Sequence, residues 1–417
     1  MVVTVFGLGF VGLTTALGFA EKGIQVYGIE SDVERFNDIF NGKVPFFEPD
    51  LDDALTRHMG KGFTITSDVP SAVVKSDCIF YCVGTPYGDS GEADLGYLFS
   101  AISDTLKAID DDNFRVLVTK STIPPSTTVE RIVPFVLREK NDCAKLGIAN
   151  NPEFLREGYC WDDFMNADRI VFGVDSENTK QVLEKLYSKF DIPIYATSFS
   201  TSEFIKYLSN TLLATLISYS NEMANAAYEI GGIDISEAFK ILHMDKRWGN
   251  SSMTSYVYPG CGYGGYCLPK DTNAFYAMMK GRNFDMPILG ATIRTNESMP
   301  DIVCEKITKE IGKSTRIGIL GLSFKPGSDD VRDSPAAKII EGLLKRGYTG
   351  ICAYDPIATE NFCCHYKFPV KYKKSMEAVA GEADIIVILT AWEDFMGIGK
   401  YGKQVIDCRY MLKLQGE

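Results

Sequence analysis

The chain has 417 residues, too many for one ordinary hydrophobic core, so we expect two or three domains. Its net charge of −12 argues against nucleic acid or an anionic membrane as the main partner, although a small phosphate-bearing ligand needs only local positive charge. No stretch reaches the ~18 apolar residues of a membrane helix.

The apolar N-terminus lacks the basic region and cleavage site of a signal peptide, so we expect a cytoplasmic protein. Its 11 cysteines should then be reduced thiols. Their spacing shows no paired CxxC zinc pattern, and we expect no metal site. Cys363, Cys364 and His365 could suggest one, but we place them in a surface loop.

The N-terminal region has the pattern of a parallel α/β sheet. A buried strand at 2–6, a glycine turn, a helix and a second strand at 24–29 form a βαβ opening. Strands at 78–84 and 115–120 continue it, and each leads into a polar loop. Ligands of open α/β sheets bind at such carboxyl ends.

Gly7-Leu-Gly9-Phe10-Val11-Gly12 is a GxGxxG motif placed between the first strand and the helix. Its glycines allow a tight turn, close approach to a pyrophosphate and packing of helix on strand. Glu30 ends the second strand, where a carboxylate accepts ribose hydroxyls and repels a 2′-phosphate. This pattern favours NAD over NADP, although Arg35 could accommodate that phosphate, and FAD or an empty turn are the alternatives.

Residues 200–228 predict one long helix without internal Pro or Gly. Ser200 and Glu203 could form a capping box at its start. Apolar residues recur at helical spacing, at 204, 205, 208, 212, 213, 216 and 219. The helix could connect two α/β regions and form a dimer surface, or it could be an internal core helix of one protomer.

The segment 259–271 combines four glycines between Gly260 and Gly265 with Cys267, Lys270 and Asp271. Such a turn lets a ligand approach the backbone, and a nearby cation with exposed N–H groups stabilises a thiolate. We therefore consider Cys267 a candidate nucleophile. A buried core cysteine is the alternative, and Cys261 in the same loop is a competitor.

The C-terminal part repeats the order of the first, with predicted strands at 316–322, 351–356, 383–392 and 405–408. Lys325 and Arg332 lie in its first loop and suggest a phosphate ligand held by side chains. The expected fold is α/β, with two Rossmann-like doubly wound domains joined by a long central helix. We divide the chain at 1–199, 200–300 and 301–417.

The motifs, taken in order, resemble those of the UDP-glucose/GDP-mannose dehydrogenase family along almost the whole chain. They are FGLGFVG, VGTP with ADLGYL, KSTIPPST, NPEFLREG, the Lys206–Asn210 pair, GYGGYCLPKD and GLSFKPGSDDVRDSP. The resemblance implies homodimers, with NAD on the N-terminal domain and UDP near the C-terminal one. It implies oxidation of a sugar C6 alcohol to a carboxylate with two NAD, through a thiohemiacetal and then a thioester on Cys267.

The resemblance also assigns roles to residues that match the family motifs. Lys206 would handle the C6 proton, Asn210 the reacting oxygen and Glu153 the hydrolytic water, while Thr122 and Asp271 would support them. Cofactor contacts would be Gly7, Gly9, Phe10, Val11, Gly12, Glu30, Arg35, Thr85, Pro86, Thr122, Glu157, Lys270 and Arg332. Substrate contacts would be Glu153, Phe154, Leu155, Lys206, Asn210, Arg247, Tyr258, Gly260, Gly264, Phe324, Lys325 and Arg409.

Without the resemblance, these pairs have simpler interpretations. Lys206 and Asn210, four residues apart on one helix face, could be a solvated polar face. Glu153 and Glu157 could be surface carboxylates on a short helix.

The chain departs from the family pattern at two places. Cys408-Arg409-Tyr410 replaces Gly-Arg-Asn, which weakens the role of Arg409, and Trp248 replaces an Ile. GYGGYC with Lys270 and Asp271 looks like the type that oxidises UDP-glucose. GDP-mannose and UDP-N-acetylhexosamine are the alternative substrates. A single-hydride 3-hydroxyacid or acyl-CoA dehydrogenase, or a non-catalytic NAD-binding protein, are the alternative classes.

Overall fold

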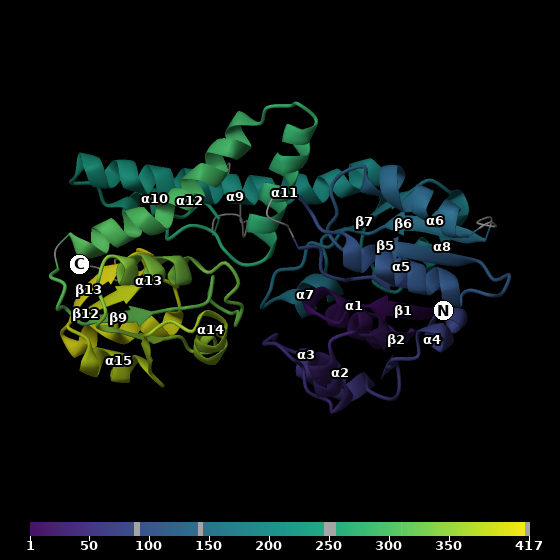
Figure 1. Cartoon of the computed structure of the whole chain (residues 1–417), viewed down its shortest axis with the longest axis horizontal. Coiled ribbons are helices and arrows are strands. Elements are labelled where there is room, and N and C mark those ends of the chain that lie inside the picture. The colour runs from purple at the N-terminus through teal and green to yellow at the C-terminus, as the bar shows by residue number, and fades with distance from the viewer. Residues whose placement is uncertain (87–91, 141–144, 246–255, 310, 413–417) are drawn as a thin grey trace. The chain divides into compact units, whose positions relative to one another are not determined.

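The computed structural model describes residues 1–86, 92–140, 145–245, 256–309 and 311–412 (Figure 1). The chain forms two compact units, Met1–Ser209 and Asn210–Glu417, and the division falls inside the long helix α9 (Phe199–Ile230). Each unit is an α/β structure with its own sheet, so the predicted fold class is confirmed.

Unit 1 is built on an eight-stranded sheet in the order β3-β2-β1-β4-β5-β6-β7-β8. Of the pairings in the described chain, β6 with β7 is antiparallel and the others of this sheet are parallel. The strands are β1 (Val2–Phe6), β2 (Gln25–Ile29), β3 (Phe63–Ile65), β4 (Cys78–Tyr81), β5 (Arg115–Thr119), β6 (Leu146–Asn150), β7 (Ile170–Val174) and β8 (Ile194–Thr197).

Helices cover both faces of this sheet, because its central strands are apolar on both sides. Helix α1 is almost entirely buried and contacts α3 and α7. The helical elements are α1 (Phe10–Glu21), α2 (Val33–Phe40), α3 (Leu51–His58), α4 (Val69–Lys75), α5 (Gly96–Ala108), the π-helical turn η1 (Thr128–Ile132), α6 (Val133–Glu139), α7 (Cys160–Met165) and α8 (Glu177–Tyr187).

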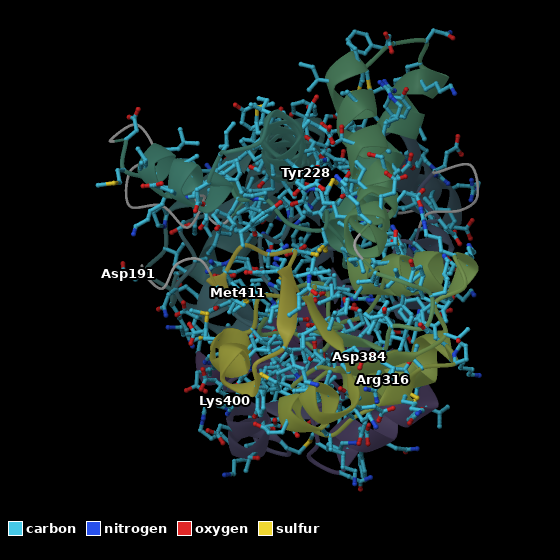
Figure 2. The ribbon with its side chains drawn as sticks, turned by 90° about the vertical axis from the view of Figure 1, so that its left-hand side faces the viewer. Asp191, Tyr228, Arg316, Asp384, Lys400 and Met411 are labelled. Atoms are coloured by element: carbon cyan, nitrogen blue, oxygen red, sulfur yellow. The ribbon has the colours of Figure 1, made fainter. Side chains whose placement is uncertain are left out.

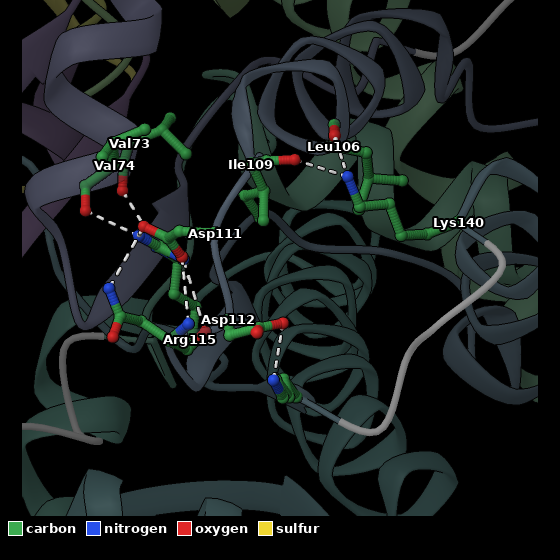
Figure 3. A network of polar contacts seen from close by, with 10 residues as sticks. Val73, Val74, Leu106, Ile109, Asp111, Asp112, Arg115 and Lys140 are labelled. Carbon is green, nitrogen blue, oxygen red and sulfur yellow. Dashed lines mark hydrogen bonds and ion pairs between the residues drawn. The ribbon is translucent and has the colours of Figure 1, made fainter.

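A buried arginine ties β5 to the helix that precedes β4 (Figure 3). Arg115 is 1% exposed, and its guanidinium donates to both carboxylate oxygens of Asp111 at 2.5 and 2.7 Å. It also donates to the carbonyls of Val73 and Val74. All of these acceptors satisfy a charge that would otherwise be costly to bury.

Helix α9 extends the predicted helix 200–228 by one residue at its start and two at its end. The predicted capping box is wrong. Ser198 caps the helix instead, because its hydroxyl accepts from the Thr201 N–H. The Glu203 carboxylate accepts from the backbone N–H groups of Ser126 and Thr128, so it holds the loop after β5 rather than the helix end.

Unit 2 contains a parallel five-stranded sheet in the order β11-β10-β9-β12-β13. Its strands are β9 (Ile317–Leu320), β10 (Ile351–Tyr354), β11 (Lys371–Tyr372), β12 (Ile385–Ile388) and β13 (Gln404–Asp407). Its helices are the rest of α9, α10 (Ile235–His243), α11 (Cys267–Gly281), α12 (Pro287–Thr308), α13 (Pro335–Lys345), α14 (Thr359–Tyr366), α15 (Met376–Glu382) and the 3₁₀ helix η4 (Glu393–Tyr401).

Two cores fill the faces of the second sheet, as in unit 1. Figure 2 labels Arg316 and Asp384, which join the starts of β9 and β12 through an exposed ion pair of 2.5 Å. Cys363, Cys364 and His365 lie in α14, so their predicted placement in a surface loop is wrong. Among the described residues, no helix is both long and apolar enough to cross a lipid bilayer.

Candidate active site

The glycine motif turns between β1 and α1 as the sequence predicts. Gly7 has φ +81°, and a Cβ on Gly12 would lie 1.7 Å from the Gly7 carbonyl oxygen, so neither position accepts a side chain. A Cβ on Gly9 would meet nothing within 4 Å. No side chain of the described residues caps α1 at Gly9. The helix start therefore combines open space with backbone N–H groups, which suits a pyrophosphate.

Phe10 and Val11 begin α1 at this site. The Phe10 ring packs on Phe46 with centroids 4.1 Å apart, and the Val11 carbonyl accepts from the Thr15 hydroxyl. Across the loop ends of β4 and β5, the hydroxyl of buried Thr85 donates to the Thr122 carbonyl at 2.8 Å. Pro86 follows Thr85 and is half-buried.

Glu30 lies at the end of β2, with its side chain 4% exposed. Its carboxylate accepts from the N–H groups of Leu8, Ser31 and Asp32 at 2.8 to 2.9 Å. Arg35 pairs with Glu30 at 3.3 Å. The sequence left open whether Arg35 would accommodate a 2′-phosphate. In the structure the Arg35 charge is directed to Glu30, the carboxylate that favours ribose hydroxyls.

A buried ion pair joins the loop after β6 to helix α9. The Lys206 ammonium lies 2.8 Å from the Glu153 carboxylate, and both side chains are at most 6% exposed. Glu153 also accepts from the Leu155 N–H at 2.7 Å, and Lys206 lies 5.6 Å from the centre of the Phe154 ring. Burial opposes the charge on Glu153, but Lys206 and the hydrogen bonds outweigh burial and lower its pKa.

These positions overturn the simpler interpretations of the sequence. Lys206 and Asn210 are 4% and 6% exposed, so they are not a solvated polar face. Residues 151–156 form an irregular loop rather than a short helix, with Glu153 buried and Glu157 half-buried. Lys206, Thr122 and Glu203 help to line a small cavity of about 10 Å³, roughly the space of one water molecule.

Sequence reasoning missed two asparagines that hold this loop. Asn150 donates to the Phe199 carbonyl at 3.2 Å, and Asn151 donates to the Val171 carbonyl at 2.9 Å. Both are 2% exposed. Polar amides directly before Pro152 at the end of a buried strand were the available signal, because such amides need partners when they are buried.

A second group of polar residues lies in unit 2, at the start of α11. Cys267 is the first residue of this helix and is half-buried. Lys270 and Asp271 follow within the first turns, are at most 2% exposed and form an ion pair with each other. Asn210 donates to the second oxygen of Asp271 at 2.6 Å.

The electrostatics of this turn favour a thiolate at Cys267. Burial lowers the pKa of Lys270, but the attraction of Asp271 and Cys267 outweighs burial and raises it, so Lys270 stays a cation. A helix N-terminus and a cation both stabilise an adjacent thiolate. Cys261 is only 1% exposed, although hydrogen bonding with the Cys408 thiol lowers its pKa. Its burial makes it a poorer nucleophile for a substrate than Cys267.

The glycine loop before Cys267 packs tightly on its surroundings. A Cβ on Gly260 would lie 2.1 Å from the Arg409 guanidinium, and one on Gly264 would lie 2.4 Å from the Asp333 carbonyl oxygen. Arg409 Nε is buried without a hydrogen-bond partner among the described residues. A buried guanidinium N–H without a partner is a sign that a ligand completes its bonding.

The other predicted substrate contacts in unit 2, and the predicted cofactor contact Arg332, are spread over several loops. The Tyr258 hydroxyl contacts Ser236 and donates to the Tyr410 carbonyl, both at 3.1 Å. Phe324 packs against Gly265, and Lys325 lies 5.6 Å from its ring centre. Arg332 bonds Asp330 at 2.6 Å and stacks over Tyr266 at 4.5 Å. Arg247 and Trp248 lie outside the described residues.

Family models cover almost the whole chain. Residues 1–191 match the NAD binding domain of the UDP-glucose/GDP-mannose dehydrogenase family, residues 200–298 its central domain and residues 318–414 its UDP binding domain. The chain belongs to this family. The resemblance predicted from the motifs is confirmed, and the cofactor of this dehydrogenase is NAD rather than FAD.

Individual relatives agree with this assignment. The chain is 35% identical over 397 residues to UDP-glucose 6-dehydrogenase of Bacillus subtilis, covering 94% of this chain and 88% of that one. It is 36% identical over 406 residues to UDP-glucose 6-dehydrogenase of Rickettsia bellii, covering 95% and 91%. The structure of a UDP-glucose dehydrogenase from Pyrobaculum islandicum superposes with a TM-score of 0.92 at 34% identity, covering 99% and 95%.

Proposed function

We propose that the enzyme is a UDP-glucose 6-dehydrogenase, which oxidises the C6 alcohol of UDP-glucose to the carboxylate of UDP-glucuronate. The observation that carries this proposal is the half-buried Cys267 at the start of α11, beside the Lys270 cation. A dehydrogenase that removes a single hydride needs no nucleophile, whereas oxidation through an aldehyde to an acid benefits from one. Relatives named UDP-glucose 6-dehydrogenase support the choice of substrate.

Bound NAD supplies the chemistry of hydride acceptance in each of two oxidations, so two NADH form per sugar. Lys206 takes the proton of the C6 hydroxyl, and Asn210 donates a hydrogen bond to the same oxygen. The Cys267 thiolate adds to the resulting C6 aldehyde, and the thiohemiacetal is oxidised to a thioester. Glu153 removes a proton from the water that attacks the thioester, and the Cys267 thiol leaves.

The remaining predicted contacts follow from the charge of the ligands. Gly7, Gly9, Gly12 and the start of α1 would hold the NAD pyrophosphate, and Glu30 would bind the ribose. Lys325, Arg409 and Arg332 would place positive charge near phosphate groups, and Tyr258 and Phe324 would contact the sugar nucleotide. Their roles are part of this proposal, as is the division of the chain into 1–199, 200–300 and 301–417, which the family-model boundaries support.

The deciding experiment counts the NADH formed per UDP-glucose consumed by the purified enzyme with excess NAD. We expect two NADH per sugar and UDP-glucuronate as the product. Cys267→Ala should abolish complete turnover, whereas Cys261→Ala, a change in the same loop, should keep the ratio of two. One NADH per sugar would contradict the role of Cys267. Turnover with GDP-mannose or a UDP-N-acetylhexosamine, but not UDP-glucose, would replace the substrate while keeping the chemistry.

We also propose that the enzyme is a homodimer that uses α9 as an interface. Leu212, Tyr219 and Met223 are 36 to 50% exposed and follow helical spacing along this helix, which is unusual for large apolar side chains in a monomer. Light scattering should give twice the chain mass for the wild type. Leu212→Glu with Met223→Glu should give a monomer, and Val33→Glu, at another exposed apolar position, should leave the dimer intact.

A cytoplasmic location completes the proposal. The ten cysteines in the described residues form no disulfide with one another, as expected for a reducing compartment. Cell fractionation should recover the enzyme with soluble cytoplasmic markers, and recovery from an extracellular or membrane fraction would contradict this part.

A further inference from the structure

A second lysine is buried against the loop that carries Glu153, and it interacts electrostatically with both Glu153 and Lys206. Lys120 directly follows β5 and is 4% exposed. A lysine is rarely buried to this extent unless it is paired. It belongs to the KSTIPP segment, for which the proposed reaction gives no task beyond that of Thr122.

Asn151 holds Lys120 in place. The Asn151 side-chain oxygen accepts from the Lys120 ammonium at 3.0 Å and from the Tyr187 hydroxyl at 2.7 Å. Its amide group donates to the Val171 carbonyl at 2.9 Å, which fixes the orientation of the side chain. The Lys120 ammonium also lies 5.8 Å from the centre of the Phe164 ring. No carboxylate of the described residues forms an ion pair with Lys120.

The proposed reaction creates an electrostatic problem at Lys206. A lysine that is paired with a buried carboxylate holds its proton tightly, since losing the proton would leave that carboxylate without a counter-charge. Lys206 must nevertheless lose a proton before it can accept one from the C6 hydroxyl. A second cation near the pair removes this obstacle, because the deprotonated cluster is then neutral overall.

We infer that Lys120 is a positioning residue whose positive charge lets Lys206 release its proton while Glu153 remains an anion. With Lys120 charged, loss of the Lys206 proton leaves one cation and one anion, instead of a solitary buried carboxylate. Lys120 would act through Lys206 and Glu153 and not through the substrate. This inference rests on the proposed function, because it assumes that Lys206 and Glu153 are the proton acceptors.

The charged and titratable groups around Lys120 act on its pKa in both directions. Burial lowers the pKa of Lys120, Lys206 lowers it further, and Cys82 and Glu153 oppose the change. Lys120 in turn contributes to the lowered pKa of Glu153. Burial raises the pKa of Cys82 to about 12 and raises that of Tyr187, so both stay neutral at physiological pH. Among these neighbours, Glu153 and Lys206 therefore carry the charge that Lys120 faces.

The test compares Lys120→Gln, which removes the charge, with Lys120→Arg, which keeps it. Removing a nearby cation raises the pKa of both Lys206 and Glu153, so the acid limb of the kcat profile should move up by about one pH unit in Lys120→Gln. The limb should stay in place in Lys120→Arg and in Tyr187→Phe, which removes a hydrogen bond to Asn151 but no charge. Asn151→Asp keeps the side-chain shape but places a carboxylate next to Lys120 that compensates its charge. This variant should therefore also move the acid limb upward.

A second measurement does not depend on turnover. In enzyme with ¹³C-labelled glutamate carboxyl groups, the Glu153 signal, assigned with Glu153→Gln, should titrate at higher pH in Lys120→Gln and Asn151→Asp than in the wild type. Unmoved titration and an unmoved acid limb would overturn the inference, even if the rate falls at every pH. A moved titration in an enzyme that does not oxidise UDP-glucose would instead refute the proposed function and keep the electrostatic coupling.

Discussion

The sheets of the two units each begin with an apolar strand and a glycine turn, but the loops that follow these first strands differ. Gly7 and Gly321 both have positive φ, +81° and +95°, where the chain leaves β1 and β9. In unit 1 the helix α1 then starts at once, at Phe10. In unit 2 the long loop 321–334 precedes α13 and carries Lys325 and Arg332.

In each unit, an acid at the end of the second strand of the sheet accepts hydrogen bonds from the loop after the first strand. Glu30 accepts from the Leu8 N–H, and Asp355 accepts from the Leu322 and Ser323 N–H groups. Asp355 is 1% exposed and uses both oxygens for internal hydrogen bonds. The two sheets therefore present different groups after their first strand: backbone N–H groups at a helix start in unit 1, and cationic side chains on a longer loop in unit 2.

The largest effect should come from the glycines of the first loop. Gly12→Ala places a Cβ against the Gly7 carbonyl and should destabilise the enzyme by about 3 kcal/mol in thermal or urea unfolding. Gly9→Ala meets open space and should keep wild-type stability, yet weaken NAD binding about tenfold because the Cβ takes the room of the pyrophosphate. Equal stability of both variants would mean that the two glycines do not have separate tasks.

Next in size is the contrast between the two acids. Asp355→Asn turns an amide toward N–H donors inside the protein and should cost about 2 kcal/mol of stability, with NAD affinity unchanged. Glu30→Gln should change stability less but reduce the preference for NAD over NADP about tenfold, since Arg35 is released from its partner. Unfolding curves and titration with both cofactors would separate these outcomes.

A moderate effect is expected from the cationic loop of unit 2. Lys325→Ala should raise the KM for UDP-glucose about tenfold, the worth of one charge-assisted hydrogen bond, with little change in kcat. Lys345→Ala on α13 is the control, because that lysine is 71% exposed and pairs with Glu341 on the surface. An unchanged KM in Lys325→Ala would show that the loop does not bind phosphate.

The smallest effect should follow Arg316→Ala. Hydrogen bonds from Arg316 lower the pKa of Asp384 to about 2, and the variant should return it toward 3.8. Because the folded-state pKa is the lower one, the pair stabilises the fold above pH ~3.8 and loses this contribution as the pH falls toward 2. The exposed pair should therefore give a slightly lower Tm at pH 7 and no difference in strong acid. A large decrease in Tm at pH 7 would contradict this small contribution of the exposed ion pair.

Much of the fold was predictable because it follows from local patterns. β1 was predicted residue for residue, since an apolar strand before a glycine turn has few alternatives. The predicted cap at the start of α9 was wrong, because Ser198 and Ser200 are equivalent cap candidates in the sequence. Tertiary contacts of Glu203 with Ser126 and Thr128 decided between them.

The candidate site was likewise predictable only in part. Motif order alone indicated Cys267, Glu153 and Lys206, but it gave no sign that the last two are a buried pair or that Lys120 is buried and interacts electrostatically with both. Burial of a charge depends on which strands and helices pack around it, and those neighbours come from distant segments such as α8 and α9.

The sequence by itself determined the two Rossmann-like units, the NAD loop and the family, because strand periodicity, glycine spacing and motif order are local properties of the chain. The tertiary structure alone decided which polar residues lose water and which partners they gain. That distinction sets the charge of Glu153, Lys206 and Lys120, since an ionisable group responds to its surroundings in space rather than to its neighbours in sequence.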